Sequence, residues 1–151
     1  MNKKTKKNDS FGKVLAKELK SQAEEIDTFI KDTLREIRTQ DNLSDYEISY
    51  KFSSKPKSRW HKTVAAEINV DNVYKTANII LRPEIVEMYR SDDKNMIKKI
   101  LCHEVSHIRI EPLAKLSLDR FSGHKEIGEA IETLTEHYGR LLYHKVNDGK
   151  K

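Results

Sequence analysis

Two histidines and a glutamate stand close together in residues 100–108, ILCHEVSHI. An α-helix turns about 100° and rises about 1.5 Å per residue, so His103 and His107 would share one face, about 6 Å apart along the axis. Two imidazole nitrogens at this spacing can bind one metal ion. Glu104 could then reach a water molecule on that ion without being a ligand. The pattern therefore favours metal-assisted hydrolysis.

The position of these three residues on the helix supports this interpretation. On a helical wheel they lie inside or at the border of an apolar face, whereas Cys102 and Ser106 lie on the other face with several basic residues. Without partners, an acid and two imidazoles in an apolar wall would be costly. The alternative is a chance pattern with hydrogen-bonded core histidines. Two histidines at ligand spacing beside an acid favour the metal site.

A third ligand must come from elsewhere, because catalytic zinc normally has three protein ligands and one open position. Residues 128–143, GEAIETLTEHYGRLLY, offer Glu132 and Glu136, one helical turn apart, whereas Glu126 and Glu129 are expected to be solvated. The helix has a predicted apolar stripe of Ile127, Ile131, Leu134, Tyr138, Leu141 and Leu142. Beside that stripe lie three small residues that would permit close helix packing, namely Gly128, Thr135 and Gly139.

HEVSH, followed after 24 residues by ETLTE, resembles the gluzincin arrangement of the thermolysin type. The resemblance implies that Glu132 binds zinc and that Glu136 hydrogen-bonds His103, a common arrangement for ligating histidines. Glu136 replaces the usual aspartate, so the two acids remain alternatives for the third ligand. Residues 22–146, with Trp60 and the strand TANIIL, resemble small one-domain metallopeptidases encoded by bacteriophages and prophages.

These residues predict a zinc-dependent metallopeptidase that acts on a peptide or protein substrate. Zinc would lower the pKa of water to about 7, and Glu104 would accept the proton and later return it to the leaving amine. Tyr143 and His124 are candidates for stabilising the transition state, with packing and loop roles as the alternatives. Residues 76–81, TANIIL, are a candidate substrate-binding edge or else a simple core strand.

The surrounding sequence predicts an α+β fold, a minimal zincin-like single domain with a small antiparallel sheet. We expect a helix over 11–38, strands over 46–52, 60–70 and 73–82, a helix from Ser91 to Pro112, and a last helix over 124–146. Asp71 and Asn72 are expected to form a tight hairpin turn. The domain is expected to cover 11–147, between a disordered basic tail over 1–10 and a disordered C-terminus over 148–151.

Charge and composition restrict the other classes of function. The formal net charge is +5, and the first 20 residues carry all of it. No apolar run has the length of a signal peptide or a membrane span, so we expect a cytoplasmic monomer with no membrane partner. Cys102 is the single cysteine, which excludes a disulfide within the chain.

Three other functions remain open. Residues 51–62, KFSSKPKSRWHK, interleave basic and aromatic side chains and could contact nucleic acid, although a solvated loop with Trp60 in the core is the simpler interpretation. The chain could also bind zinc without catalysing a reaction. It could be a repressor-cleaving protease of a mobile element, a class usually accompanied by a DNA-reading domain.

Overall fold

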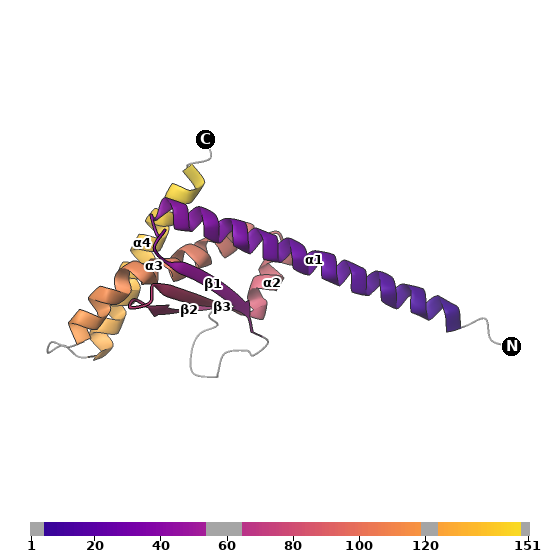
Figure 1. Cartoon of the computed structure of the whole chain (residues 1–151), viewed down its shortest axis with the longest axis horizontal. Coiled ribbons are helices and arrows are strands. Elements are labelled where there is room, and N and C mark those ends of the chain that lie inside the picture. Colours follow the sequence, from indigo (N-terminus) through magenta and orange to yellow (C-terminus); the bar gives the residue numbers. More distant parts are fainter. Residues whose placement is uncertain (1–4, 54–64, 119–123, 149–151) are drawn as a thin grey trace. The chain divides into compact units, whose positions relative to one another are not determined.

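The fold is α+β, as predicted. The structure, a computed structural model, describes residues 5–53, 65–118 and 124–148, and the side chains within 21–53, 65–114 and 127–148. Its elements in chain order are α1 (Thr5–Gln40), β1 (Glu47–Phe52), β2 (Ala66–Asp71), β3 (Thr76–Leu81), α2 (Pro83–Arg90), α3 (Lys94–Leu118) and α4 (His124–Asp148) (Figure 1). Within these ranges, no helix is both long and apolar enough to cross a membrane.

The chain divides into two compact units, residues 1–32 and residues 33–151. The described part of the first unit is the N-terminal portion of α1. The second unit holds the end of α1, the sheet and α2 to α4. Helix α1 begins at Thr5, so it extends into the segment that was predicted to be a disordered tail. Residues 1–4 and 149–151 lie outside the described part of the chain.

The sheet is mixed, so the prediction of a purely antiparallel sheet was wrong. Its strand order is β1-β3-β2, with β1 parallel to β3 and β2 antiparallel to β3. Consecutive strands favour antiparallel pairing only when a short turn joins them. The chain between Phe52 and Ala66 is long enough to pass the end of β3, which allows β1 to pair with β3 instead of β2.

The predicted hairpin between β2 and β3 is present, but its loop is longer than the predicted two-residue turn. Residues 72–75 form the turn, and Asp71 is the last residue of β2. The Asp71 Oδ1 accepts hydrogen bonds from the backbone nitrogens of Val73 (2.9 Å) and Tyr74 (3.1 Å). Lys75 completes the turn with a positive φ of 53°. An Asx turn thus replaces the tight turn.

Strand β3 is the central strand, so of the two interpretations of residues 76–81 the simple core strand is confirmed and the substrate-binding edge is not. Its alternate residues Ala77, Ile79 and Leu81 are buried. Among the described strands, β2 pairs only with β3 and is therefore an edge strand. Strand β2 also packs against α3. The edge strand that contacts the HEVSH helix is β2.

Helix α2 was not predicted. Pro83 stands at its start, where the missing N–H is not needed. Ser91, where the next helix was expected to begin, is instead the C-cap of α2. Asp93 caps α3, because its Oδ1 accepts a hydrogen bond from the Met96 backbone nitrogen at 3.2 Å.

Helix α3 continues past Pro112, which was expected to end it. Proline removes the hydrogen bond to the carbonyl of residue 108 and crowds that carbonyl, which usually kinks or breaks a helix. Here the helical backbone nevertheless extends to Leu118.

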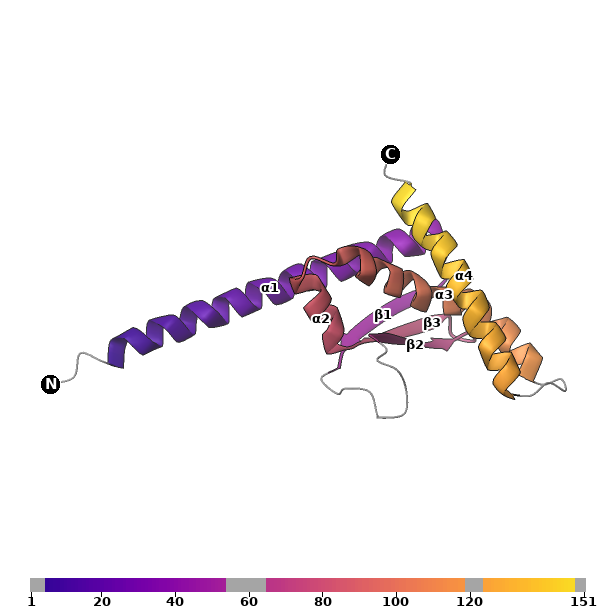
Figure 2. The same ribbon diagram turned by 180° about the vertical axis from the view of Figure 1, so that it is seen from behind.

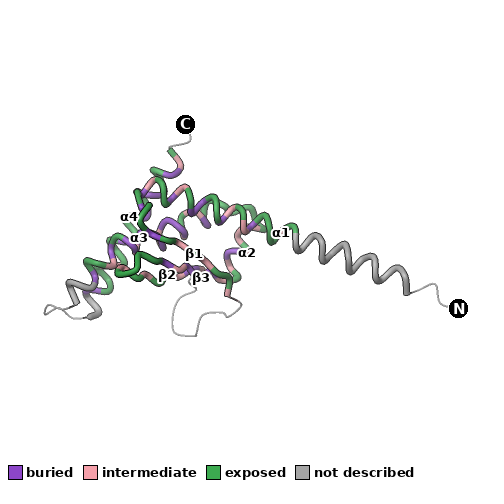
Figure 3. The backbone as a smooth tube through the Cα atoms, in the orientation of Figure 1, coloured by how far each residue is buried: buried purple, intermediate pink, exposed green. Residues whose placement is uncertain are grey.

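Helices α3 and α4 pack against each other and run antiparallel (Figure 2). Three contacts show the direction: His107 faces Glu132, His103 faces Glu136, and Lys99 faces Tyr143. Helix α3 also contacts the sheet through β2, and its buried residues lie along the whole described length (Figure 3). The fully buried ones include Ile97, Leu101, Cys102, Val105 and Ser106. Helix α3 is therefore covered on more than one side.

Candidate metal centre

The two histidines of HEVSH lie side by side on α3. Their ring centroids are 5.1 Å apart, and their side chains are 25% (His103) and 18% (His107) exposed. Burial lowers the pKa of His107. The charge of Glu132 raises it, but this effect is smaller than that of burial. His107 is therefore neutral at pH 7, and a neutral imidazole is the form that can bind a metal ion.

Glu132 of α4 reaches both histidines. Its Oε2 lies 3.7 Å from the His103 Nε2, and its Oε1 lies 3.9 Å from the His107 Nε2. One donor atom from each of the three residues falls within 4.8 Å of the other two. Donors bound to a tetrahedral zinc ion lie about 3.3 Å apart. A small side-chain adjustment would therefore let these two nitrogens and one oxygen hold a zinc ion.

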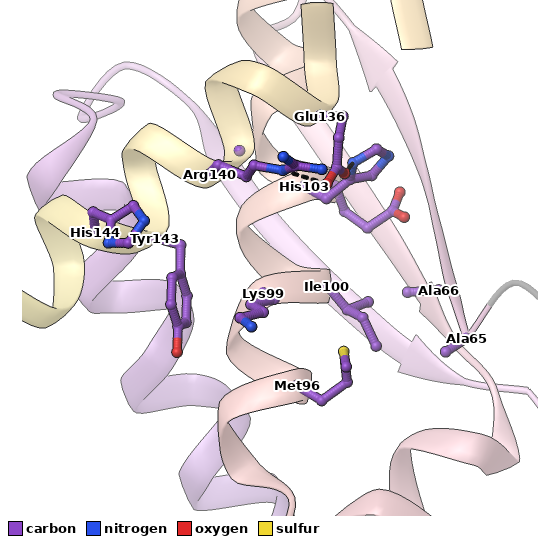
Figure 4. A pocket seen from close by; sticks show the side chains of 12 residues that line it. Ala65, Ala66, Met96, Lys99, Ile100, His103, Glu136, Arg140, Tyr143 and His144 are labelled. Carbon is purple, nitrogen blue, oxygen red and sulfur yellow. Dashed lines mark hydrogen bonds and ion pairs between the residues drawn. The ribbon is translucent and has the colours of Figure 1, made fainter. Parts of the chain in front are cut away.

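Glu136 contacts the opposite nitrogen of His103. Its Oε2 lies 3.1 Å from the His103 Nδ1, and its Oε1 accepts a hydrogen bond of 2.9 Å from the Arg140 Nε (Figure 4). The Arg140 hydrogen bond is the main cause that lowers the pKa of Glu136, followed by His103. Because a carboxylate only accepts, the His103 Nδ1 carries the proton. In the neutral imidazole, the His103 Nε2 is then the nitrogen with a free lone pair, and it faces Glu132.

Gly139 allows α4 to approach α3 at this position. A Cβ on Gly139 would lie 3.0 Å from the His103 Cα and 3.3 Å from the His103 backbone nitrogen. Thr135 on the same face is fully buried. Gly128 was predicted to belong to this contact, but a Cβ there would meet nothing within 4 Å. The close approach therefore involves the part of α4 that carries Glu132 and Glu136.

Glu104 is buried, with an exposed fraction of 7%. It lines a cavity of about 550 Å³ together with His103 and Glu136. A carboxylate in this position could act on a ligand that enters the cavity and reaches His103. The predicted general base and the predicted ligand thus share one accessible space.

The helical wheels assigned some residues of α3 and of α4 to the wrong face. Cys102 and Ser106 were assigned to the polar face of α3, yet both are fully buried, and burial raises the pKa of the Cys102 thiol to about 12. The Ser106 hydroxyl donates to the Cys102 carbonyl at 2.6 Å. On α4, Leu134 and Leu141 were assigned to the apolar stripe but are exposed. The buried face of α4 centres instead on Thr135, Gly139, Leu142 and Val146.

Of the two candidates for stabilising the transition state, the structure places the side chain of Tyr143 but does not describe that of His124. Tyr143 lines the same cavity, but its hydroxyl points away from His103 and Glu136 in Figure 4. Its ring contacts Lys99 and His144 instead. His124 begins α4, and its side chain lies outside the described residues.

Sequence reasoning missed Arg140, although its spacing was a usable signal. A glutamate four residues before an arginine is a favourable helix pair, and Glu136 stands in that relation to Arg140. It also missed a cluster of hydrogen bonds around the buried Asp41. The Tyr138 hydroxyl donates to the Asp41 carboxylate, and Arg109 donates to the Asp41 carbonyl at 2.5 Å. Burial, with help from Asp41, raises the pKa of Tyr138 to about 12. These contacts tie α3 and α4 to the end of α1.

The different contacts of the two acids predict different effects of removing them. Glu136→Ala should weaken zinc binding by about 10- to 100-fold, the usual effect of losing a group that orients a ligand. Glu132→Ala should weaken it more, because a donor atom is lost. Calorimetric titration with zinc would measure both, with Glu129→Ala as a control at an exposed position of α4. Equal zinc affinity in Glu132→Ala and wild type would assign the third ligand elsewhere.

Residues 51–62, for which nucleic-acid contact was the alternative to a solvated loop, lie mostly outside the described residues, including Trp60. Comparison with protein-family models, with curated proteins and with solved structures found no match in any of the three. The function is therefore inferred from the geometry of the site.

Proposed function

We propose that this protein is a zinc-dependent metallopeptidase in which His103, His107 and Glu132 hold the ion. The observation that supports this most is the approach of Glu132 to the Nε2 atoms of both histidines, at 3.7 and 3.9 Å, from a second helix. Glu136 adds support, since it accepts from the Nδ1 of His103 and leaves the Nε2 for the ion. Two imidazoles and one carboxylate are ligands typical of catalytic zinc.

A bound zinc ion would supply Lewis-acid chemistry, which lowers the pKa of water to about 7 and polarises a carbonyl group. Glu104 would accept a proton from the attacking water and return it to the nitrogen of the leaving amine. Arg140 would hold Glu136 in place, and Glu136 would keep the His103 ring oriented. The outer edge of β2, which packs against α3, could align an extended peptide through backbone hydrogen bonds.

Metal analysis tests the proposal directly. Protein purified without chelators should contain one zinc ion per chain, and His103→Ala should lose it because two ligands cannot replace three. Elemental analysis by mass spectrometry would measure the content. His144→Ala is the matched control, since His144 is an exposed histidine on α4. The absence of zinc and every other divalent metal from the wild-type protein would refute the proposal.

A further inference from the structure

The cavity beside the candidate metal centre has two kinds of wall. Its volume of about 550 Å³ lies in the range of small-ligand sites, which is about 300 to 1,000 Å³. One wall is apolar and is formed by Ala65, Ala66, Met96 and Ile100. In Figure 4, Met96 and Ile100 lie between Lys99 and the two alanines. The cavity extends from His103 along the preceding two turns of α3.

The other wall carries positive charge. Lys99 lies one helical turn before His103, and its Nζ is 5.4 Å from the centroid of the Tyr143 ring. Among the residues whose side chains are described, Lys99 forms no ion pair with a carboxylate. The cation–π contact with Tyr143 fixes the ammonium group at the cavity wall without neutralising its charge.

The remaining charges of the lining do not compensate Lys99. Arg140 is a second cation, and it is paired with Glu136. Glu136 also contacts His103, and Glu104 is buried beside the same histidine. Both acids are thus at the end of the cavity near the metal centre, whereas Lys99 lies a turn away. A ligand that fills this space would need an apolar part near Met96 and Ile100 and a negative group near Lys99.

We propose that Lys99 makes this cavity specific for peptides that present a bulky apolar side chain together with a neighbouring carboxylate. This inference rests on the proposed peptidase function, because it concerns the substrate of the same site. The carboxylate could belong to an acidic side chain next to the apolar residue or to the free C-terminus of the peptide. Both would form the same charge-assisted hydrogen bond with the lysine ammonium group.

The experiment uses synthetic peptides in which one leucine is followed by glutamate, glutamine or lysine in otherwise identical sequences. Each is made with a free and an amidated C-terminus. Hydrolysis by the zinc-loaded protein is read by mass spectrometry, and binding to zinc-loaded Glu104→Gln is read by fluorescence anisotropy. We expect binding and kcat/KM to be about tenfold higher when the recognised carboxylate is present, that is, for glutamate over lysine or for the free over the amidated C-terminus, the effect of one charge-assisted hydrogen bond.

Lys99→Glu should reverse the preference, toward the lysine peptide or toward the amidated C-terminus. Lys51→Glu is the matched control, because Lys51 is an exposed lysine on β1 that does not line the cavity. If amidation weakens all three peptides equally, the carboxylate is that of the C-terminus. If the glutamate peptide is preferred over the other two with either C-terminus, the carboxylate is that of the acidic side chain.

The two proposals fail in different ways. Hydrolysis with no preference among the three peptides and no effect of amidation, or with the same change in both lysine variants, would overturn the role of Lys99 and leave the peptidase proposal standing. If no peptide is cleaved, the peptidase proposal fails, and the binding measurement still decides the specificity. Lys99-dependent binding of the carboxylate peptides would then support the cavity assignment, and binding without that dependence would overturn it.

Discussion

Glu104→Gln is expected to keep zinc and to lower kcat for peptide hydrolysis by about 10²- to 10⁴-fold, the usual contribution of a general base. Glutamine has nearly the same size as glutamate, so it should fit the buried position of Glu104. It cannot accept a proton at neutral pH, whereas the three proposed ligands remain in place. Parallel measurement of zinc content and of hydrolysis rate would separate binding from catalysis.

Glu129→Gln provides the control, because it makes the same chemical change at an exposed position of α4. Zinc content and rate should both match the wild type in this variant. If Glu104→Gln hydrolyses peptides at the wild-type rate, the base is another group. If it loses zinc instead, Glu104 belongs to the ligand set and not to the proton transfer.

The arrangement of the candidate site could be predicted where it depends on local helix geometry. The four-residue spacing of His103 and His107 places both on one face of any helix, whatever the rest of the chain does. The same is true of Glu132 and Glu136 on α4. Antiparallel packing then sets the two acids opposite the two histidines, so that Glu132 lies near both and Glu136 contacts His103.

The burial of α3 could not be predicted from its own periodicity. A helical wheel assumes one apolar and one solvated face. Helix α3 contacts β2 on one side and α4 on another, so residues assigned to solvent are buried as well. Cys102 is small and tolerates this position. Ser106 satisfies its hydroxyl within the helix, through the carbonyl of Cys102.

The strand with which β1 pairs is not encoded in the local sequence. Each strand was predicted near its observed place, but β1 could pair with either β2 or β3. Only the second choice makes the sheet mixed and puts β3 at its centre. The candidate for the free edge changed with it, from residues 76–81 to β2. Pairing between distant strands is decided by packing of the whole domain.

Gly139→Leu is expected to lower the free energy of unfolding by about 3 kcal/mol, because the new side chain would overpack the contact between α3 and α4. Even its Cβ would lie 3.0 Å from the His103 Cα, and a backbone atom inside a helix cannot move alone. Helix α4 would have to shift, taking Glu132 and Glu136 away from the histidines. Zinc affinity should therefore fall together with stability, as measured by calorimetric titration and urea denaturation.

Gly128→Leu makes the same change on the same helix where a Cβ would meet nothing within 4 Å. It should raise the free energy of unfolding by about 0.5 to 1 kcal/mol, since leucine is a better helix former than glycine, and it should leave zinc affinity unchanged. Opposite signs in the two variants would separate helix propensity from interhelical packing. If Gly139→Leu lowers stability while zinc binds with wild-type affinity, the ion does not depend on the approach of α4, and Glu132 is not its ligand.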